Sequence, residues 1–305
     1  MTEYARHFSG EEEMRSFISE CEKIYKDQIN SVASGILSSC ETRFIMLSGP
    51  TCSGKTTTSK ILIENFEKHG KNVRAISIDD FYKSRDELIA LAGENGEPDF
   101  ESASAIDIAY FSECVEKMLA GREVMLPVCE FVAGERTEYV KYVPSEGDMI
   151  IFEGIQALYP EITENIPRDK RKSVFISVAD DLWAYGKGFD RELIRFLRRL
   201  VRDYQFRASS PHRTLFLYRG VLQNEHDNLN LLSKNVDYNI NSLLLYELNV
   251  IKKYVLELVE YDPEMPDEIK LFEYLQKLFA DVPQIPSALV PADSVFREFI
   301  GRQPF

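Results

Sequence analysis

Apolar residues form short continuous runs, and longer segments with helical spacing separate these runs. The runs predict five buried strands, at residues 43–48, 73–79, 149–155, 172–178 and 236–240. Apolar positions three and four apart predict helices at about 10–40, 59–69, 103–119, 243–259 and 267–280. Residues 123–143 alternate around a glycine-containing turn, which predicts a β-hairpin projecting from the sheet. Strands alternating with helices predict an α/β fold with a five-stranded, mainly parallel sheet flanked by helices.

The link between the first strand and its helix is a glycine-rich loop, GPTCSGKTT at residues 49–57. It has the form G-x-x-x-x-G-K-T in the strand–loop–helix context that a phosphate loop requires. Backbone N–H groups and a helix N-terminus then surround an anion. The residues expected to hold ATP are Gly49, Thr51, Cys52, Ser53, Gly54, Lys55, Thr56 and Thr57. Lys55 should reach the β- and γ-phosphates and the Thr56 hydroxyl should ligate Mg²⁺, so the sequence predicts a nucleoside triphosphate site.

Two further strands end on acidic residues. Asp79 and Asp80 follow the second predicted strand, and Glu153 ends the third. Functional groups gather at the carboxyl ends of parallel strands. We therefore expect Asp79 to accept a proton from a substrate hydroxyl and Asp80 to be solvated. Glu153 is expected to bind Mg²⁺ or orient water.

Arginines are concentrated between residues 191 and 213. Spacings of three and four place Arg191, Arg195, Arg198 and Arg202 on one helix face. One interpretation is a solvated cationic stripe paired with acids. In a chain this acidic, we favour a phosphate clamp on a lid helix at about 188–213.

The formal net charge of −14 argues against nucleic acid or an anionic membrane as a partner. The start of the chain is polar and acidic, and no apolar run is long enough to span a bilayer. The five cysteines form no C-x-x-C pair, which is typical of reduced thiols. These features predict a cytoplasmic protein, and they leave open whether it forms a homo-oligomer.

Several segments together resemble one known family. They are GPTCSGKTT at 49–57, D-x-F-Y at 79–82, DFESASAID at 99–107, PVCEF at 127–131, FEGI at 152–155, RRLVRD at 198–203 and the Asn241-Ser242 and Tyr246-Glu247-Leu248 pairings. In this order they resemble the uridine kinase branch of the phosphoribulokinase/uridine kinase family, over roughly residues 40–250. The resemblance implies a P-loop kinase fold at 41–260 with a small β-hairpin substrate subdomain. It leaves helical extensions at 1–40 and 261–305 outside the shared region.

The resemblance also implies an activity, which is transfer of the γ-phosphate of ATP, with Mg²⁺, to the 5′-hydroxyl of a nucleoside. Asp79 would be the general base, and Thr56, Glu153 and Asp79 would surround Mg²⁺. Lys55, Arg202 and Arg207 would hold the transferred phosphate. The residues implied on the substrate side are Tyr82, Glu101, Phe131, Arg136 and Arg199.

Departures from the family pattern leave the acceptor open. Cys129 and Gly134 stand where uridine–cytidine kinases carry the Tyr and His that read the pyrimidine, and Ser209 replaces an arginine. One alternative is a sugar or sugar-phosphate kinase of the same family, for which Arg136 and Arg195 could supply cations. Another is a non-catalytic nucleotide-binding regulator. The choice between ATP and GTP is open as well.

Overall fold

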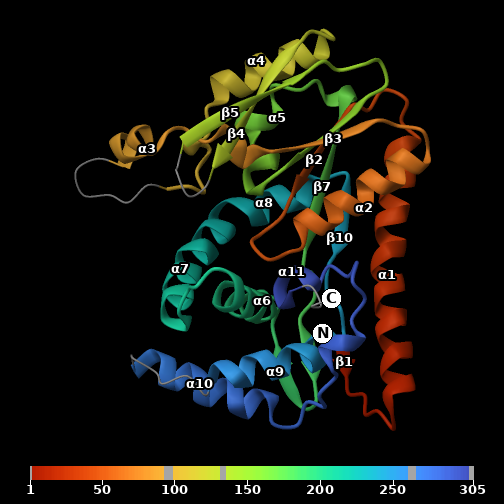
Figure 1. The fold of residues 1–305 in the computed structure, drawn as a ribbon, viewed down its shortest axis with the longest axis vertical. Coiled ribbons are helices and arrows are strands. Elements are labelled where there is room, and N and C mark those ends of the chain that lie inside the picture. Colours follow the sequence, from red (N-terminus) through yellow and green to blue (C-terminus); the bar gives the residue numbers. More distant parts are fainter. Residues whose placement is uncertain (1, 93–98, 131–134, 260–265, 302–305) are drawn as a thin grey trace.

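The structure, a computed structural model, describes residues 2–92, 99–130, 135–259 and 266–301 (Figure 1). Its centre is a five-stranded parallel sheet with the strand order β10-β7-β2-β6-β3. The strands are β2 (Phe44–Ser48), β3 (Val73–Ser77), β6 (Met149–Glu153), β7 (Arg171–Ser177) and β10 (Tyr238–Asn241). The predicted fold class is confirmed.

The central strands are apolar throughout because helices or other elements cover both faces of the sheet. All five residues of β2 are buried. Ile45 and Leu47 belong to one hydrophobic cluster, and Phe44 and Met46 belong to a second cluster on the opposite face. This division follows from the pleat, which points successive side chains to opposite sides.

The larger cluster is covered mainly by helices. They are α1 (Glu11–Leu37), α2 (Lys55–Lys68), α6 (Arg191–Phe206), α9 (Glu247–Val259), α10 (Pro266–Phe279) and α11 (Arg297–Ile300). Residues 10–40 were expected to form one or two helices, and they form the single long helix α1 (Figure 1, red). Both expected extensions, 1–40 and 261–305, contribute buried residues to this cluster.

The second cluster lies beneath α4 (Ile108–Leu119), α5 (Pro160–Thr163) and the predicted hairpin. The hairpin consists of the antiparallel strands β4 (Val124–Glu130) and β5 (Glu135–Tyr142), with a bulge between Val128 and Cys129. It lies with α4 at the top of Figure 1. Of its expected turn, 133–136, the first two residues lie outside the described residues and the last two belong to β5.

Several shorter elements were not expected. A second sheet consists of β1 (Thr2–Tyr4), β8 (Leu182–Ala184) and β9 (Lys187–Phe189). Helices α3 (Arg85–Ala92), α7 (Pro211–Asn224) and α8 (Asn230–Leu232) were also missed, as was the π-helix Glu225–Leu229. Single 3₁₀ turns are at Ile78–Phe81, Ala103–Ala105, Ile155–Leu158, Arg168–Lys170, Ser233–Asn235 and Ser287–Leu289. Among the described residues, no helix has the length and apolarity needed to cross a bilayer.

Candidate active site

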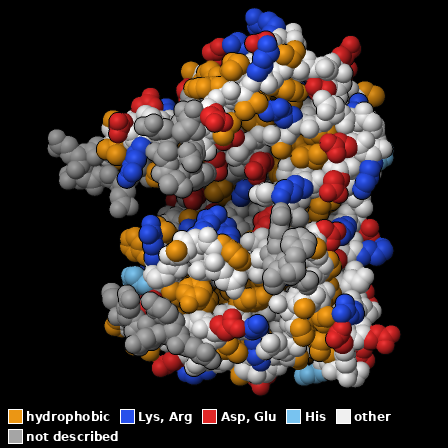
Figure 2. Space-filling model, viewed as in Figure 1, with side chains coloured by type: hydrophobic (Ala, Val, Ile, Leu, Met, Phe, Trp, Pro, Cys, Tyr) orange, Lys and Arg blue, Asp and Glu red, His pale blue; other side chains and the backbone are white. Residues whose placement is uncertain are grey.

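A cleft of about 710 Å³ opens at the carboxyl ends of β2, β3 and β6. Figure 2 shows a hollow between the upper and lower parts of the molecule with acidic and basic side chains around it. The cleft is lined by Thr51, Cys52, Ser53, Gly54, Lys55, Thr56, Ser77, Asp79, Glu153, Gly154, Ile155, Arg202, Arg207 and Glu298. The structure therefore brings the predicted phosphate loop, the two predicted acids and two of the predicted arginines to one cavity.

The phosphate loop has the conformation that an anion cradle needs. Gly54 has φ 93° and begins α2, so the loop turns directly into the helix. Lys55 Nζ donates hydrogen bonds to the carbonyl oxygens of Gly49 and Pro50, at 2.9 and 3.1 Å. Ser53 Oγ is buried and has no hydrogen-bond partner within the described part of the chain. An unpartnered hydroxyl and the backbone N–H groups of a helix N-terminus fit the phosphates of ATP.

Asp79 and Glu153 are brought together by a close approach at Gly154. Asp79 lies in the 3₁₀ turn that follows β3, and its N–H donates to Ser77 Oγ at 3.3 Å. A Cβ atom at Gly154 would lie 2.9 Å from Ile78 Cβ and 3.7 Å from Asp79 Oδ1. A larger residue after Glu153 would therefore push the two strand ends apart.

Burial raises the pKa of both carboxyl groups. Desolvation is the main cause for Asp79 and Glu153, and the charge of Lys55 lowers each pKa in part. The charge of Asp79 raises the pKa of Glu153 further. Two desolvated carboxylates near one lysine favour a further cation.

The donor set fits Mg²⁺ better than a metal held by protein alone. Within the described residues, no group of three or more His, Cys, Asp or Glu side chains is placed to hold a metal. Mg²⁺ usually takes one or two carboxylates and completes its shell with phosphates and water. Thr56, Asp79 and Glu153 line one cleft in that manner.

Arg195 and Arg198 do not face the cleft, so for these two residues the expected phosphate clamp is wrong. Arg195 makes a buried pair with Glu225, with Nη1 to Oε1 at 2.7 Å. Arg198 is fully buried against Glu247, with Nε to Oε2 at 2.6 Å. Their remaining donors reach the loop backbone, at the Thr51 carbonyl (3.4 Å) and the Cys52 carbonyl (3.1 Å). The alternative, a solvated stripe paired with acids, is correct for the pairing but wrong for the solvation, because both side chains are buried.

The next arginines of the segment surround Asp203, a buried residue of α6. Arg202 donates to Asp203 Oδ1 at 2.9 and 2.7 Å, and Arg207 Nε lies 3.7 Å from the same oxygen. Arg202 and Arg207 still line the cleft. Arg199 donates to Asp203 Oδ2 at 3.2 Å and lies over the Tyr218 ring.

The expected acceptor residues Tyr82 and Glu101 are not among the residues that line the cleft. Tyr82 donates its hydroxyl proton to the Phe100 carbonyl (2.7 Å) and accepts from Gln156 Nε2 (3.1 Å). Glu101 Oε2 accepts from Asn224 Nδ2 at 2.6 Å. Burial raises the pKa of Glu101, while the charges of Arg199 and Lys55 lower it in part.

Two expected acceptor residues have no described side chain. The first is Phe131, which lies outside the described residues. Gly134, noted above as a departure from the family pattern, lies outside them as well. Arg136 belongs to β5 and pairs with Cys129 in the hairpin, but its side chain is not described.

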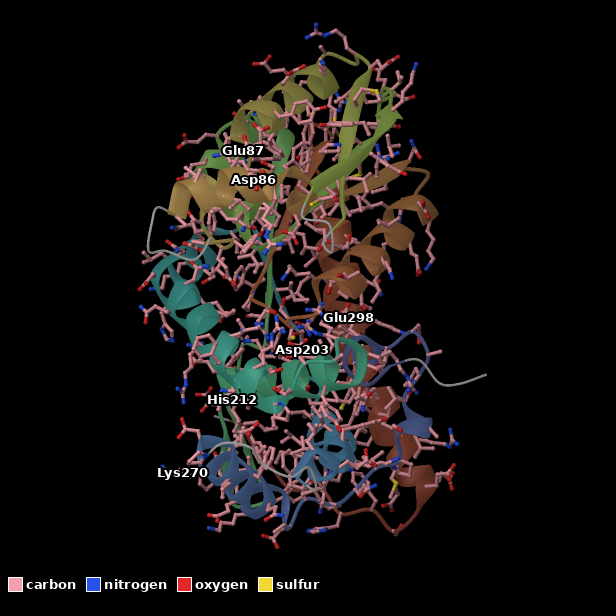
Figure 3. The ribbon with its side chains drawn as sticks, turned by 60° about the vertical axis from the view of Figure 1, so that its left-hand side comes forward. Asp86, Glu87, Asp203, His212, Lys270 and Glu298 are labelled. Carbon is pink, nitrogen blue, oxygen red and sulfur yellow. The ribbon has the colours of Figure 1, made fainter. Side chains whose placement is uncertain are left out.

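Sequence reasoning missed the roles of Asp80 and Glu298. Asp80 was expected to be solvated, yet its Oδ1 accepts the Cys129 N–H at 3.1 Å and so ties the hairpin to the Asp79 turn. Glu298 Oε1 accepts from the Thr57 N–H at 2.6 Å and from Thr57 Oγ1 at 2.5 Å. Figure 3 shows Glu298 close in projection to Asp203, and α11 packs on α6. The sequence separation of 241 residues gave no signal for this contact.

A parallel sheet with a phosphate loop on its central strand and acids on the neighbouring strands defines a P-loop kinase fold. Residues 44–215, more than half of the chain, match the Phosphoribulokinase / Uridine kinase family. The chain belongs to this family.

Curated relatives agree with the family at low identity. The chain is 24% identical over 257 residues to the uridine kinase of Schizosaccharomyces pombe, covering 82% of this chain and 51% of that protein. It therefore spans about half the length of that relative. It is 28% identical over 180 residues to the uridine kinase of Lactobacillus johnsonii, covering 59% of this chain and 76% of that protein.

One solved structure supports the fold. A candidate fructose transport system kinase from Silicibacter sp. TM1040 is similar with a TM-score of 0.50 at 16% identity, covering 69% of this chain and 98% of that chain. At this identity the similarity concerns the fold alone.

Proposed function

We propose that this protein transfers the γ-phosphate of ATP to a hydroxyl group of a small molecule, and specifically to the 5′-hydroxyl of a nucleoside. The observation that carries the proposal is that Asp79, Glu153, Lys55 and Arg202 line one cleft with the phosphate loop. Phosphoryl transfer requires positioning and charge neutralisation more than covalent chemistry from the protein. The residues in this cleft are suited to both tasks.

Each cleft residue has a proposed task. The loop and Lys55 hold the polyphosphate of ATP, and Arg202 and Arg207 neutralise charge from the opposite wall. Thr56, Asp79 and Glu153 would hold Mg²⁺, which would supply positive charge to neutralise the outer phosphates. Asp79 accepts the proton of the acceptor hydroxyl.

The nucleoside acceptor is supported by the polar groups next to Asp79. Glu101 and Asn224 together present a carboxylate and an amide, which suit the vicinal hydroxyls of a ribose. Tyr82 and Gln156 form a hydrogen-bonded wall beside them. Relatives named uridine kinase support the same acceptor class.

The sugar-phosphate alternative loses one of its two candidate cations. Arg195 is held by Glu225 and is buried, so it is not available to a substrate phosphate. The test is a panel of nucleosides, sugars and sugar phosphates with ADP release as the readout. We expect turnover with at least one nucleoside; turnover with sugars alone would contradict the nucleoside assignment, and acceptor-independent hydrolysis would favour a regulator.

The role of Asp79 has a direct test. Asp79→Asn should retain ATP binding and lower the transfer rate by about 10²–10³-fold, because one positioned charged group is lost. Asp86→Asn is the matched control, since Asp86 is an exposed acid on α3 outside the cleft. Steady-state transfer and ATP affinity are measured for both, and an unchanged rate in Asp79→Asn would exclude Asp79 as the base.

A further inference from the structure

The C-terminal segment supplies an anion to the phosphate loop. Thr57 lies in the first turn of α2, where backbone N–H groups have no partner within the helix. Glu298 Oε1 accepts hydrogen bonds from both the N–H and the hydroxyl of Thr57, at 2.6 and 2.5 Å. Charge-assisted hydrogen bonds of this kind are about twice as strong as neutral ones.

The donors that Glu298 uses belong to the cradle that a nucleotide needs. The N–H groups of a phosphate loop and of its helix N-terminus surround the α- and β-phosphates of a bound nucleotide. A carboxylate on Thr57 and a phosphate at the same donors exclude each other, by shared hydrogen bonds and by like charge. Glu298 also lies among the residues that line the cleft.

The backbone that carries Glu298 is firmly held. The Arg297 guanidinium donates to the carbonyl oxygens of Ser287 (2.9 Å) and Pro291 (3.2 Å), and the Phe299 ring lies 4.9 Å from the Arg198 guanidinium. Val295 lies so close to the loop that a Cβ atom at Gly54 would come within 2.5 Å of it. By contrast, the Glu298 side chain is only partly buried, so it is free to rotate while the segment stays in place.

We propose that Glu298 is a built-in competitor of the nucleotide: its carboxylate occupies a phosphate position on Thr57 in the nucleotide-free protein and swings away when the nucleotide binds. The inference rests on the nucleotide site of the proposed function, but it does not depend on phosphoryl transfer. It assigns a regulatory contact to the C-terminal segment, which keeps the empty loop ordered and lowers its affinity for phosphates.

The test uses the full chain and the variants Glu298→Ala and Glu298→Gln. Glu67→Gln is the matched control, because Glu67 is an exposed acid at the other end of α2. Affinities for inorganic pyrophosphate and for ATP are measured by calorimetry at one salt concentration. Thermal unfolding of the ligand-free proteins is measured alongside.

We expect both Glu298 variants to bind pyrophosphate and ATP about tenfold more tightly, by a similar factor for the two ligands. The ligand-free unfolding temperature should fall for Glu298→Ala, because the Thr57 N–H loses its partner, and should fall less for Glu298→Gln, whose amide oxygen still accepts from this N–H without a charge. Glu67→Gln should change neither quantity. If only Glu298→Gln folds, the affinity gain is expected from that variant alone.

Unchanged or weaker binding of pyrophosphate by the Glu298 variants would overturn the inference and would make Glu298 a structural cap or a nucleotide ligand. Binding by neither the unaltered protein nor the variants would overturn it together with the nucleotide site. Tighter binding without transfer to any acceptor would leave the inference intact and would contradict only the proposed kinase reaction.

Discussion

At the scale of single residues, the two acids of the cleft are destabilised in their charged form by burial. Asp79 and Glu153 are both desolvated, and burial raises the pKa of each carboxyl group. The folded protein therefore holds their protons more tightly than the unfolded chain does. The free energy of unfolding then falls as the pH rises from the ordinary carboxyl pKa through the raised folded value.

This linkage predicts an unusual stability of the Asp79→Asn variant. At neutral pH, Asp79→Asn should be more stable than the unaltered protein, since it removes a buried charge. The difference should shrink as the pH falls from the raised pKa of folded Asp79 to the ordinary pKa of an unfolded aspartate, below which the carboxyl is neutral in both states of the chain. Urea unfolding at several pH values checks this, with Asp86→Asn as the exposed control. A stability difference that grows on acidification would contradict it.

Sequence patterns predicted the residues whose chemistry depends on local spacing. The phosphate loop, Asp79 and Glu153 are defined by motifs at strand ends. Residues 51–56 of the loop and both acids line the cleft, whereas Gly49 and Thr57 are not among its lining residues. The partners of single side chains were not predictable in this way. The spacing of Arg195 and Arg198 indicates a shared helix face, but only packing decides that Glu225 and Glu247 neutralise them. Glu298 reaches Thr57 for the same reason.

At the scale of elements, α6 supports the phosphate loop from beneath. Its buried arginines hold two consecutive loop carbonyls, of Thr51 and Cys52. Cys52 has φ 57°, a left-handed conformation that is costly for a residue with a side chain. The hydrogen bond from Arg198 helps to retain that conformation. The conformation of the phosphate loop therefore depends on buried residues of α6, a helix that also contributes to the hydrophobic core.

The buried pair of Arg198 and Glu247 should be expensive to break. Arg198→Met should lower the free energy of unfolding by about 3–5 kcal/mol, because it leaves Glu247 buried without its partner. Combining it with Glu247→Leu should restore much of that loss. ATP affinity should stay reduced in both variants, since the Cys52 carbonyl loses its donor. Chemical denaturation and calorimetry measure the two effects.

A solvent-exposed ion pair serves as the control for the buried pair of Arg198 and Glu247. Arg15→Met breaks the surface pair with Glu11 on α1 and should cost less than about 1 kcal/mol. If the double variant recovers ATP affinity as well as stability, α6 does not position the loop through Arg198.

The elements that the sequence predicted are those with long or continuous apolar patterns. The five central strands and the long helices have such patterns because two clusters bury them. The three-residue strands β1, β8 and β9 are too short to show a period. Helix α7 buries only Pro211, Thr214 and Tyr218, so no apolar stripe marks it.

At the scale of the whole molecule, the segments at both ends complete the nucleotide side of the core. Tyr25 of α1 makes a buried hydrogen bond to Thr58 of α2 at 2.6 Å. Phe296 and Phe299 are buried near α6 and α9. Residues 41–260, which carry the motifs, therefore have apolar surfaces that are covered by α1 and by the C-terminal segment.

This arrangement predicts that a chain trimmed to residues 41–260 will not fold alone. Loss of α1 and of the C-terminal segment would expose the buried faces of α2 and α6 to water. Thermal unfolding followed by circular dichroism should be cooperative for the full chain and lack a cooperative transition for the trimmed chain. A sharp transition in the trimmed chain would instead show an autonomous domain at 41–260.

The short turn that carries Asp79 also carries Asp80, whose carboxylate grips the Cys129 N–H of the hairpin. A replacement hairpin that keeps the backbone N–H at position 129 would retain this contact, whereas one that shifts the strand there would also disturb the turn beside Asp79. Exchanges that preserve the backbone path of the hairpin are therefore the ones that alter the choice of acceptor without loss of turnover.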